Sequence, residues 1–185
     1  AVLLADGRVL VAGGVTSQSR PTDPAIPTLA SAEAFDPTTG RWSAAGEMGA
    51  AGTALTATVL PGGCALVMGG TAYGADGRLS ENVHVFDPAT GAWHDAGRIS
   101  TWGPSAFLLP DGRVLIAGGL GASLELHDPR GETSVEVASP YAVTSGRAVT
   151  LLSDGRILVT GGVLLEAHGF GISSEYLASA HVYNP

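Results

Sequence analysis

Four positions in the sequence combine residue types that could ligate a metal ion. Each lies three residues before an Asp-Pro or Asn-Pro pair, and together they are Glu33, His84, Glu125 and His181. Two imidazoles and two carboxylates form a donor set that transition metals accept. Equivalent positions on sheets packed face to face lie about 10 Å apart, whereas the ligands of one ion lie about 2.0–2.3 Å from it. We therefore predict a repeated half-exposed polar position, with no metal site and no cofactor.

Two adjacent pairs, His94-Asp95 and His127-Asp128, place an imidazole beside a carboxylate and could indicate acid–base chemistry. Neighbouring residues on a strand point to opposite faces, so we expect no direct contact within either pair. The sequence lacks the Gly-x-Ser-x-Gly and His-Glu-x-x-His motifs of common hydrolases. The single cysteine, Cys64, is expected to be a small apolar residue in a strand rather than a reactive thiol. We predict no catalytic residue in this chain.

The better candidates for chemistry are arginine, histidine and aromatic residues in the segments between apolar runs. Loops on a rigid scaffold carry binding residues, and aromatic and arginine side chains anchor interfaces. Trp102 is the strongest single candidate, because it interrupts a stretch of small residues. The other predicted ligand-binding or partner-binding residues are Arg98, Tyr141, Arg147, Tyr73, Arg78, His168 and Tyr176. The proline-rich segment 15–31 is expected to be a semi-rigid insertion suited to contact with a partner or a neighbouring domain.

One motif, which occurs four times, predicts the elements that position these residues. Its clearest copy is Leu109-Pro-Asp-Gly-Arg-Val-Leu-Ile-Ala-Gly-Gly119, and the other copies begin at Leu4, Leu60 and Leu152. Asp-Gly between two apolar runs predicts a β-hairpin with a type I′ turn, in which both central residues have positive φ. The short apolar run that follows predicts a strand that ends at the Gly-Gly pair.

A second motif follows each copy of the first. It reads Phe35-Asp-Pro-Thr-Thr-Gly-Arg-Trp42 and then Phe86-Asp-Pro-Ala-Thr-Gly-Ala-Trp93. The third copy has His127 for the aromatic residue, with Thr133 or Ser134 at the tryptophan position, and the fourth is Tyr183-Asn-Pro185. Proline after aspartate, followed by glycine, predicts a tight turn between two strands.

These motifs divide the chain into units of four short strands, a to d. The a–b and c–d connections are tight turns, whereas the b–c links vary and span 15–31, 71–81, 120–122 and 163–178. Repeats of about 50 residues with this pattern are typical of β-propeller blades. We predict an all-β fold, a partial propeller over 1–185 with about four four-stranded blades. The expected blades are 1–46, 53–97, 104–138 and 146–185, the last one incomplete.

The Gly-Gly pair, the aromatic residue before Asp-Pro and the tryptophan six residues after that aspartate resemble kelch repeats. The sequence of the first motif is similar to that of the repeats in bacterial kelch proteins. The expected architecture is similar to that of the central domain of galactose-oxidase-like enzymes. This resemblance implies structural roles, in turns and between blades, for Gly13, Gly14, Phe35, Trp42, Gly69, Gly70, Phe86, Trp93, Gly118, Gly119, Gly161, Gly162 and Tyr183. Complete kelch rings usually have six or seven blades. We therefore expect a fragment or half-ring that needs the remaining blades or a second copy.

Composition excludes some classes of partner. The net charge is −8, from 9 basic and 17 acidic residues, and all the basic residues are arginine. Such an acidic chain lacks the basic stripe of a nucleic-acid-binding protein, and no apolar run approaches the roughly 18 residues of a membrane span. The sequence does not decide the cellular compartment. One interpretation is a secreted or cell-envelope bacterial protein.

Three functional hypotheses follow. The leading one is a non-catalytic binding or scaffold module that recognises a protein or glycan through its b–c and d–a loops. The alternative is part of a propeller enzyme, a copper-radical oxidase of the galactose-oxidase type or a sugar isomerase, with catalytic residues largely outside this chain. The third is a half-ring that dimerises and serves assembly.

Overall fold

The computed structural model describes residues 1–15, 28–52, 55–73, 79–99, 105–117, 124–137, 144–145, 148–168 and 171–184. Within these ranges the chain forms β-strands and turns and no helix, so the prediction of an all-β fold is confirmed. The chain divides into two compact units, residues 1–102 and residues 103–185, which are described separately.

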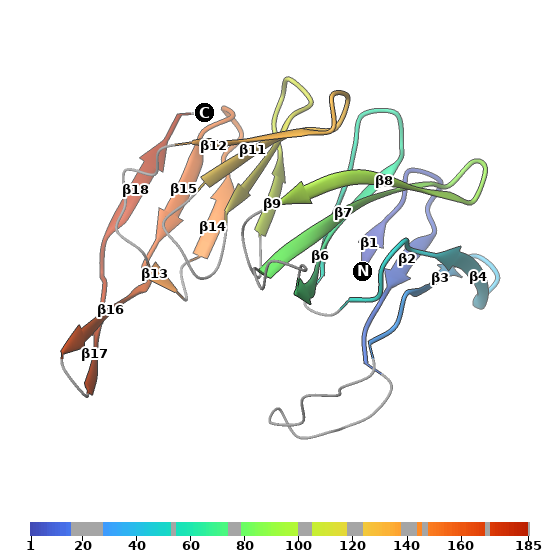
Figure 1. Ribbon diagram of the computed structural model, residues 1–185. Coiled ribbons are helices and arrows are strands. Elements are labelled where there is room, and N and C mark those ends of the chain that lie inside the picture. The colour runs from blue at the N-terminus through green and yellow to red at the C-terminus, as the bar shows by residue number, and fades with distance from the viewer. Residues whose placement is uncertain are drawn as a thin grey trace. The chain divides into compact units, whose positions relative to one another are not determined.

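The first unit contains two four-stranded antiparallel sheets, each built from strands in chain order (Figure 1). The first sheet has the order β1-β2-β3-β4, with β1 Val2–Leu3, β2 Val9–Ala12, β3 Ser31–Asp36 and β4 Arg41–Glu47. The second sheet has the order β5-β6-β7-β8, with β5 Thr56–Val59, β6 Ala65–Tyr73, β7 Leu79–Asp87 and β8 Ala92–Ile99. Each sheet is a meander of the kind expected for one propeller blade.

The second unit contains the next two sheets and a small additional one. The third sheet comprises β9 Ser105–Leu108, β10 Val114–Ala117, β11 Leu124–Asp128 and β12 Thr133–Val137. The fourth sheet has three strands, β14 Ala148–Leu151, β15 Ile157–Thr160 and β18 Ala180–Tyr183. The additional sheet comprises β13 Thr144–Ser145, β16 Val163–His168 and β17 Gly171–Tyr176. The prediction of about four consecutive meander sheets is confirmed, the fourth with three strands among the described residues.

Two of the predicted b–c links are partly wrong. The link 163–178 is largely a β-hairpin, β16–β17, and not a loop. In the second sheet, β6 runs through Gly69 and Gly70 to Tyr73, so its glycine pair does not end the strand. The physical reason is that Gly69, with φ of 120°, creates a bulge between Gly69 and Thr71, after which pairing with β7 resumes.

The a–b turn also differs from the expected type I′ geometry. Gly7 has positive φ and Asp6 does not. The Gly7 N–H donates to the Leu4 carbonyl at 3.0 Å, and the Leu4 N–H donates to the Arg8 carbonyl at 2.8 Å. These bonds form a three-residue loop that closes with glycine in a G1 bulge. The Asp6 carboxylate accepts the Arg8 N–H at 3.0 Å, which favours negative φ at the aspartate. The turns at Asp111 and Asp154 repeat this pattern.

The two faces of each sheet have different roles. Residues paired directly across antiparallel strands share a face, so register defines the rows. In the second sheet the row Val59–Ala65–Phe86–Trp93 lies on what we call the front face. It packs on the opposite, back face of the first sheet, which contributes Leu10, Ala34 and Ala45 to the same core (Figure 1).

Among the described residues, two side-chain hydrogen bonds join these sheets at their outer strands and turns. The indole Nε1 of Trp93 donates to the Ala45 carbonyl at 2.7 Å. The Arg8 guanidinium, held at Asp6 by a 2.6 Å ion pair, donates from Nη2 to the Pro88 carbonyl at 3.1 Å. Arg8 therefore connects the a–b turn of one sheet to the c–d turn of the next.

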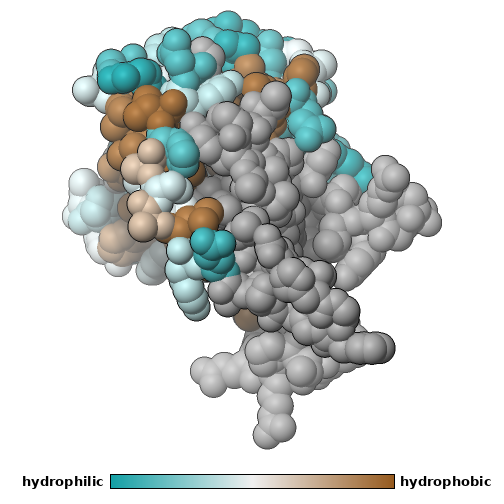
Figure 2. Space-filling view, turned by 90° about the vertical axis from the view of Figure 1, so that its left-hand side faces the viewer, coloured by the Kyte–Doolittle hydropathy of each residue, from teal (hydrophilic) through white to brown (hydrophobic). Residues whose placement is uncertain are grey.

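The second unit follows the same rule. The front row of the fourth sheet, Leu151–Ile157–Tyr183, packs on the back face of the third sheet at Leu115 and Leu126. The back face of the fourth sheet includes Val182, which is 48% exposed. Figure 2 looks onto the side of the molecule that carries β18, where apolar residues form a patch among polar ones.

The c–d turn of the third sheet contains the single non-glycine residue with positive φ in the described part of the chain. Glu132 has φ of 51° where the equivalent Gly40 and Gly91 have 67° and 73°. In the first two turns a threonine hydroxyl before the glycine donates to the aspartate, at 2.9 Å from Thr39 and 2.8 Å from Thr90. Gly131 stands at that threonine position in the third turn.

We expect Glu132→Gly to stabilise the second unit by about 0.5–1 kcal/mol, because a left-handed residue other than glycine is strained. The double variant Gly131→Thr with Glu132→Gly should gain more, since it also restores the hydroxyl donor to Asp128. Urea denaturation followed by hydrogen exchange of the β11–β12 amides measures both effects. The matched control Gly91→Ala places a side chain at positive φ in open space and should destabilise. A gain of stability in Gly91→Ala would contradict the strain argument.

Candidate functional site

The b–c connections of the second and fourth sheets extend as regular hairpins. In the second sheet, Thr71, Ala72 and Tyr73 of β6 pair with Glu81, Ser80 and Leu79 of β7, beyond the bulge. In the fourth, β16 and β17 pair over six residues, from Val163–Tyr176 to His168–Gly171. Figure 1 shows β16–β17 projecting away from β15 and β18. Sequence reasoning expected loops here; the apolar run Val163-Leu-Leu165 was the signal that could have indicated a strand.

Tyr176 is the predicted binding residue that the structure presents most fully. It ends β17, pairs with Val163 across the hairpin, and is 81% exposed. Glu175 beside it is exposed as well. In the sheet order β13-β16-β17, β17 is an edge strand. An exposed aromatic ring therefore lies at the end of a strand whose outer edge is open among the described strands.

The other predicted binding residues are not gathered around Tyr176. His168 belongs to the same hairpin, at the opposite end of its pairing. Tyr73 ends β6 opposite Leu79, and Arg98 is an exposed residue of β8 opposite Asn82. Trp102, Arg78, Tyr141 and Arg147 lie outside the described residues. Of the segment 15–31, residues 16–27 also lie outside them, and Val15 pairs with Thr28 in an isolated bridge.

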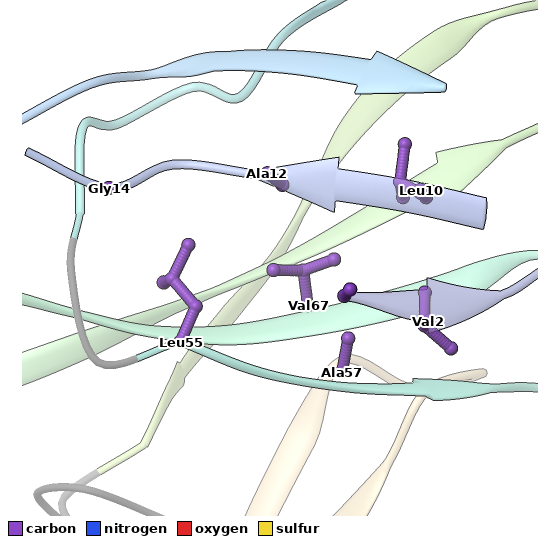
Figure 3. Close-up of a pocket in the computed structure, with 8 residues that line it drawn as sticks. Val2, Leu10, Ala12, Gly14, Leu55, Ala57 and Val67 are labelled. Atoms are coloured by element: carbon purple, nitrogen blue, oxygen red, sulfur yellow. The ribbon is translucent and has the colours of Figure 1, made fainter. Parts of the chain in front are cut away.

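An apolar pocket of about 120 Å³ lies between the first two sheets, and sequence reasoning did not anticipate it (Figure 3). The back face of the first sheet contributes Val2, Leu10 and Ala12, the second sheet contributes Ala57 and Val67, and Leu55 lies just before β5. A pocket with such a lining accepts an apolar group and offers nothing for acid–base or metal chemistry.

A polar groove of about 220 Å³ lies between the turns of the third and fourth sheets, lined by Leu109, Pro110, Asp111, Arg113, Asp154, Gly155 and Asn184. Its carboxylates are already paired, since Asp111 contacts Arg113 at 2.6 Å and Asp154 contacts Arg156 at 2.7 Å. The arginine hydrogen bonds lower the pKa of both aspartates. The groove therefore supplies no general acid or base near neutral pH.

Two buried histidines lie on the front faces of the second and third sheets. His84 is 5% exposed, and neither ring nitrogen has a hydrogen-bond partner. A Cβ on Gly49 would lie 3.3 Å from His84 Cε1, so the glycine leaves room for the ring. His127 is fully buried; its Nδ1 lies 3.0 Å from the Ser134 hydroxyl, and its Nε2 lacks a partner. Burial lowers the pKa of both imidazoles, because the charged form would lose its water.

The register also shows which residue replaces the missing tryptophan. Ser134 stands opposite His127, where Trp42 and Trp93 stand opposite Phe35 and Phe86. The aromatic pairs have ring centroids 5.2 Å and 5.0 Å apart. A buried histidine–serine contact thus takes the place of an aromatic pair in the third sheet.

The four aligned polar positions do not share one environment, contrary to the expected half-exposed row. Glu33 and His181 are exposed, whereas His84 and Glu125 are each 5% exposed. In the part of the chain that the structure describes, no three His, Cys, Asp or Glu residues come together as metal ligands. The described residues therefore do not by themselves make up a copper site; the enzyme hypothesis places the catalytic residues largely outside this chain.

We expect the stability of the first unit to fall as pH decreases below about 6.5, in part because of His84. The unfolded chain takes up a proton near its ordinary pKa of 6.5, whereas the folded chain resists until lower pH. The unfolded state therefore binds more protons below pH 6.5, and the stability is complete only above it. All three tryptophans lie within residues 1–102, so fluorescence-monitored urea unfolding between pH 7.5 and 5 measures this unit.

In His84→Leu the loss of stability over this pH range should become smaller, and stability at pH 7.5 should not fall, because two unpaired polar atoms are removed. The same substitution at the exposed His94 is the matched control. An unchanged pH dependence in His84→Leu would contradict the burial argument. Asp36 and Asp87 also have a lowered pKa, but they affect stability over a different pH range. Their contribution to stability is lost as pH falls below about 4.

Comparison with known proteins yields one family model and a set of similar structures. Residues 1–49 match the model described as Kelch motif. No curated protein sequence matches the chain. The solved structure of YjhT shares 17% identity with a TM-score of 0.58, over 80% of this chain and 59% of that one. A novel fungal alcohol oxidase of the AA5 family, in complex with copper, shares 18% identity with a TM-score of 0.66, over 95% of this chain and 40% of that one.

The chain thus spans less than two thirds of either structure, and at these identities the likeness shows the fold. Four-stranded antiparallel meanders that pack front to back define the β-propeller class. The sheets of this chain are blades of a β-propeller, and the match of residues 1–49 to the Kelch motif agrees with the resemblance seen in its two motifs. Among the described residues there is no helix long and apolar enough to cross a membrane.

Proposed function

We propose that this chain is a binding module that recognises a protein partner through the hairpin β16–β17. The observation that supports this most directly is the 81% exposure of Tyr176 at the end of an edge strand. Tyrosine is enriched among the residues that dominate protein interfaces, because its ring buries a large area and its hydroxyl still finds a partner.

The edge of β17 supports a protein partner over a glycan. An edge strand offers a row of backbone N–H and C=O groups to an extended segment of another chain. Such pairing supplies affinity through main-chain hydrogen bonds, and side chains such as Tyr176 supply specificity. A glycan would use the Tyr176 ring but not the strand edge, so the two ligands make different predictions for the backbone of β17.

The enzyme hypothesis has weaker support. The alcohol oxidase in complex with copper is similar to this chain in fold, at 18% identity. Among the described residues no three His, Cys, Asp or Glu side chains come together as metal ligands, and the carboxylates of the polar groove are paired with arginines. We therefore keep the binding module as the proposed function.

Selection from a displayed library of random peptides, beside a glycan array, tests the proposal. We expect selected peptides to protect the β17 amides from hydrogen exchange. Tyr176→Ala should weaken binding by at least about tenfold, as for a central interface tyrosine. The matched control is Val135→Ala on β12, where another exposed apolar residue, 62% exposed, is removed.

Two results would overturn the proposal. One is the recovery of peptides whose affinity is the same for the native chain and Tyr176→Ala. The other is glycan binding that depends on Tyr176 without protection of the β17 amides, which would assign the surface to carbohydrate.

A further inference from the structure

The two faces of the hairpin β16–β17 differ in chemistry. Residues paired across the hairpin share a face, and so do residues two apart on one strand. By this register, the face that includes Tyr176 also holds the aliphatic positions Val163, Leu165, Ala167 and Ile172. The opposite face includes Glu166, which is paired with Ser173, and Glu175. The hairpin therefore has one apolar face and one acidic face.

The backbone pairing shows which groups of β17 are directed outward. The Leu177 N–H donates to the Gly162 carbonyl at 2.9 Å, directly beside the pair Val163–Tyr176. Hydrogen-bonded and non-hydrogen-bonded pairs alternate in an antiparallel ladder, so Val163–Tyr176 is a non-hydrogen-bonded pair. The N–H and C=O groups of Tyr176 and Ser174 are therefore directed away from β16. They face the edge of β17 that is open among the described strands.

The base of the hairpin is fixed before any partner binds. The Gly161 N–H donates to the Ser179 carbonyl at 2.9 Å, next to the bond from Leu177 to Gly162. These two bonds join the chain on both sides of the hairpin where it leaves the fourth sheet. The edge of β17 is thus already in strand conformation, which reduces the ordering cost of adding another strand.

The charge of this region selects the chemistry of the added strand. Residues 157–185 include Glu166 and Glu175 and contain neither lysine nor arginine, and the whole chain has a net charge of −8. Glu175 is exposed and lies on the edge strand itself, beside Tyr176. Opposite charges on adjacent strands attract and like charges repel. An added strand therefore gains most from basic residues on the face of Glu175 and apolar residues on the face of Tyr176.

We propose that β17 accepts an extended segment of another protein in which apolar residues alternate with arginine or lysine. Successive residues of a strand point to opposite faces, so only a pattern of period two matches both faces at once. The backbone of the segment pairs with Tyr176 and Ser174, its apolar residues extend the face of Tyr176, and its basic residues lie beside Glu175. This inference rests on the proposed function and names the kind of partner for the same surface.

Binding of designed peptides to the full chain tests the proposal, by fluorescence anisotropy and by hydrogen exchange of β17. An eight-residue peptide that alternates valine with arginine is compared with one that alternates valine with glutamate. A third peptide has the same valine and arginine content in two blocks. We expect the alternating arginine peptide to bind at least about tenfold more tightly than either, since it alone matches both faces. It should protect the amides of Ser174 and Tyr176, and its affinity should fall between about 0.05 and 0.5 M salt.

Reversal of one charge on the hairpin tests the pairing itself. In Glu175→Arg the preference should invert, so that the alternating glutamate peptide binds more tightly than the alternating arginine peptide. The matched control is Glu136→Arg, which makes the same change of charge at an exposed glutamate of β12, the edge strand of the third sheet. This control should keep the preference for arginine. Circular dichroism checks that both variants are folded.

Three results would overturn the inference, and they separate it from the proposed function. Equal protection of Ser174 and Tyr176 by all three peptides would remove the preference for an alternating basic segment and leave the binding module standing. An inversion in Glu136→Arg as complete as in Glu175→Arg would assign the preference to net charge and not to the hairpin. Absence of β17 protection by these peptides and by the displayed library would overturn the proposed function together with the inference.

Discussion

Gly13→Ala is expected to destabilise the first unit by about 3 kcal/mol or more, among the largest effects of any single substitution in this chain. Gly13 has φ of 68°, where a side chain is strained, and strain of this kind is of order 1–3 kcal/mol. A Cβ there would lie 2.5 Å from Leu55 Cδ1 and 2.6 Å from the Gly52 carbonyl oxygen. The leucine can rotate, but the carbonyl belongs to the backbone, so relief requires the segment after β4 to move, at a further cost of about 1–3 kcal/mol.

Gly161→Ala is the matched control for this prediction. Gly161 occupies the same position of the motif with φ of 67°, but the nearest atom to its Cβ would be the Leu177 oxygen at 3.7 Å. It should therefore show the backbone strain without the clash. Tryptophan fluorescence follows unfolding of the first unit, and hydrogen exchange of β15 amides follows the second. Equal losses of stability in the two variants would contradict a close approach between Gly13 and Gly52.

Trp93→Ala is expected to destabilise the first unit by about 3 kcal/mol, near the lower end for removal of a packed aromatic residue. The substitution removes the ring that contacts Phe86, with centroids 5.0 Å apart, and the ring edge beside Gly46. It also removes the donor to the Ala45 carbonyl, at 2.7 Å. Trp93→Phe keeps most of the apolar contact and should lose about 1 kcal/mol for the hydrogen bond.

Trp42→Ala is the control that the repeat itself provides. Trp42 has the same motif position and the same aromatic partner geometry, yet it is 55% exposed. We expect a loss below about 1 kcal/mol, as for exposed substitutions. Losses of similar size in Trp42→Ala and Trp93→Ala would show that the Trp42 ring is covered in solution.

Much of the architecture could be predicted because its determinants are local. The Asp-Gly-Arg and Asp-Pro-x-Thr-Gly turns are held by bonds within five residues, such as Asp36 to Thr38 and Thr39. Their spacing alone therefore indicates four-stranded meanders and a propeller. Even the error in turn type was local, because the sequence does not show that the Asp6 carboxylate accepts the Arg8 N–H.

The candidate site could be predicted less well. Tyr176 was among the predicted residues, but its hairpin was expected to be a loop, because no local pattern shows whether two strands pair again beyond a glycine pair. His84 and Glu33 occupy the same motif position and differ in burial. The difference comes from the neighbouring sheet that covers one position and not the other, and no local pattern encodes that neighbour.

By itself, the sequence determined the repeat, the strand order and the turns of this protein, since hydrogen bonds and backbone preferences act over a few residues. The tertiary structure alone decided which face of each sheet is covered, and so which residues of one motif are core and which are surface. Trp93 donates a hydrogen bond to the Ala45 carbonyl, whereas the Trp42 side chain is exposed, although their motifs are almost identical. The physical reason is that burial depends on contacts between sheets, which join residues tens of positions apart in the chain.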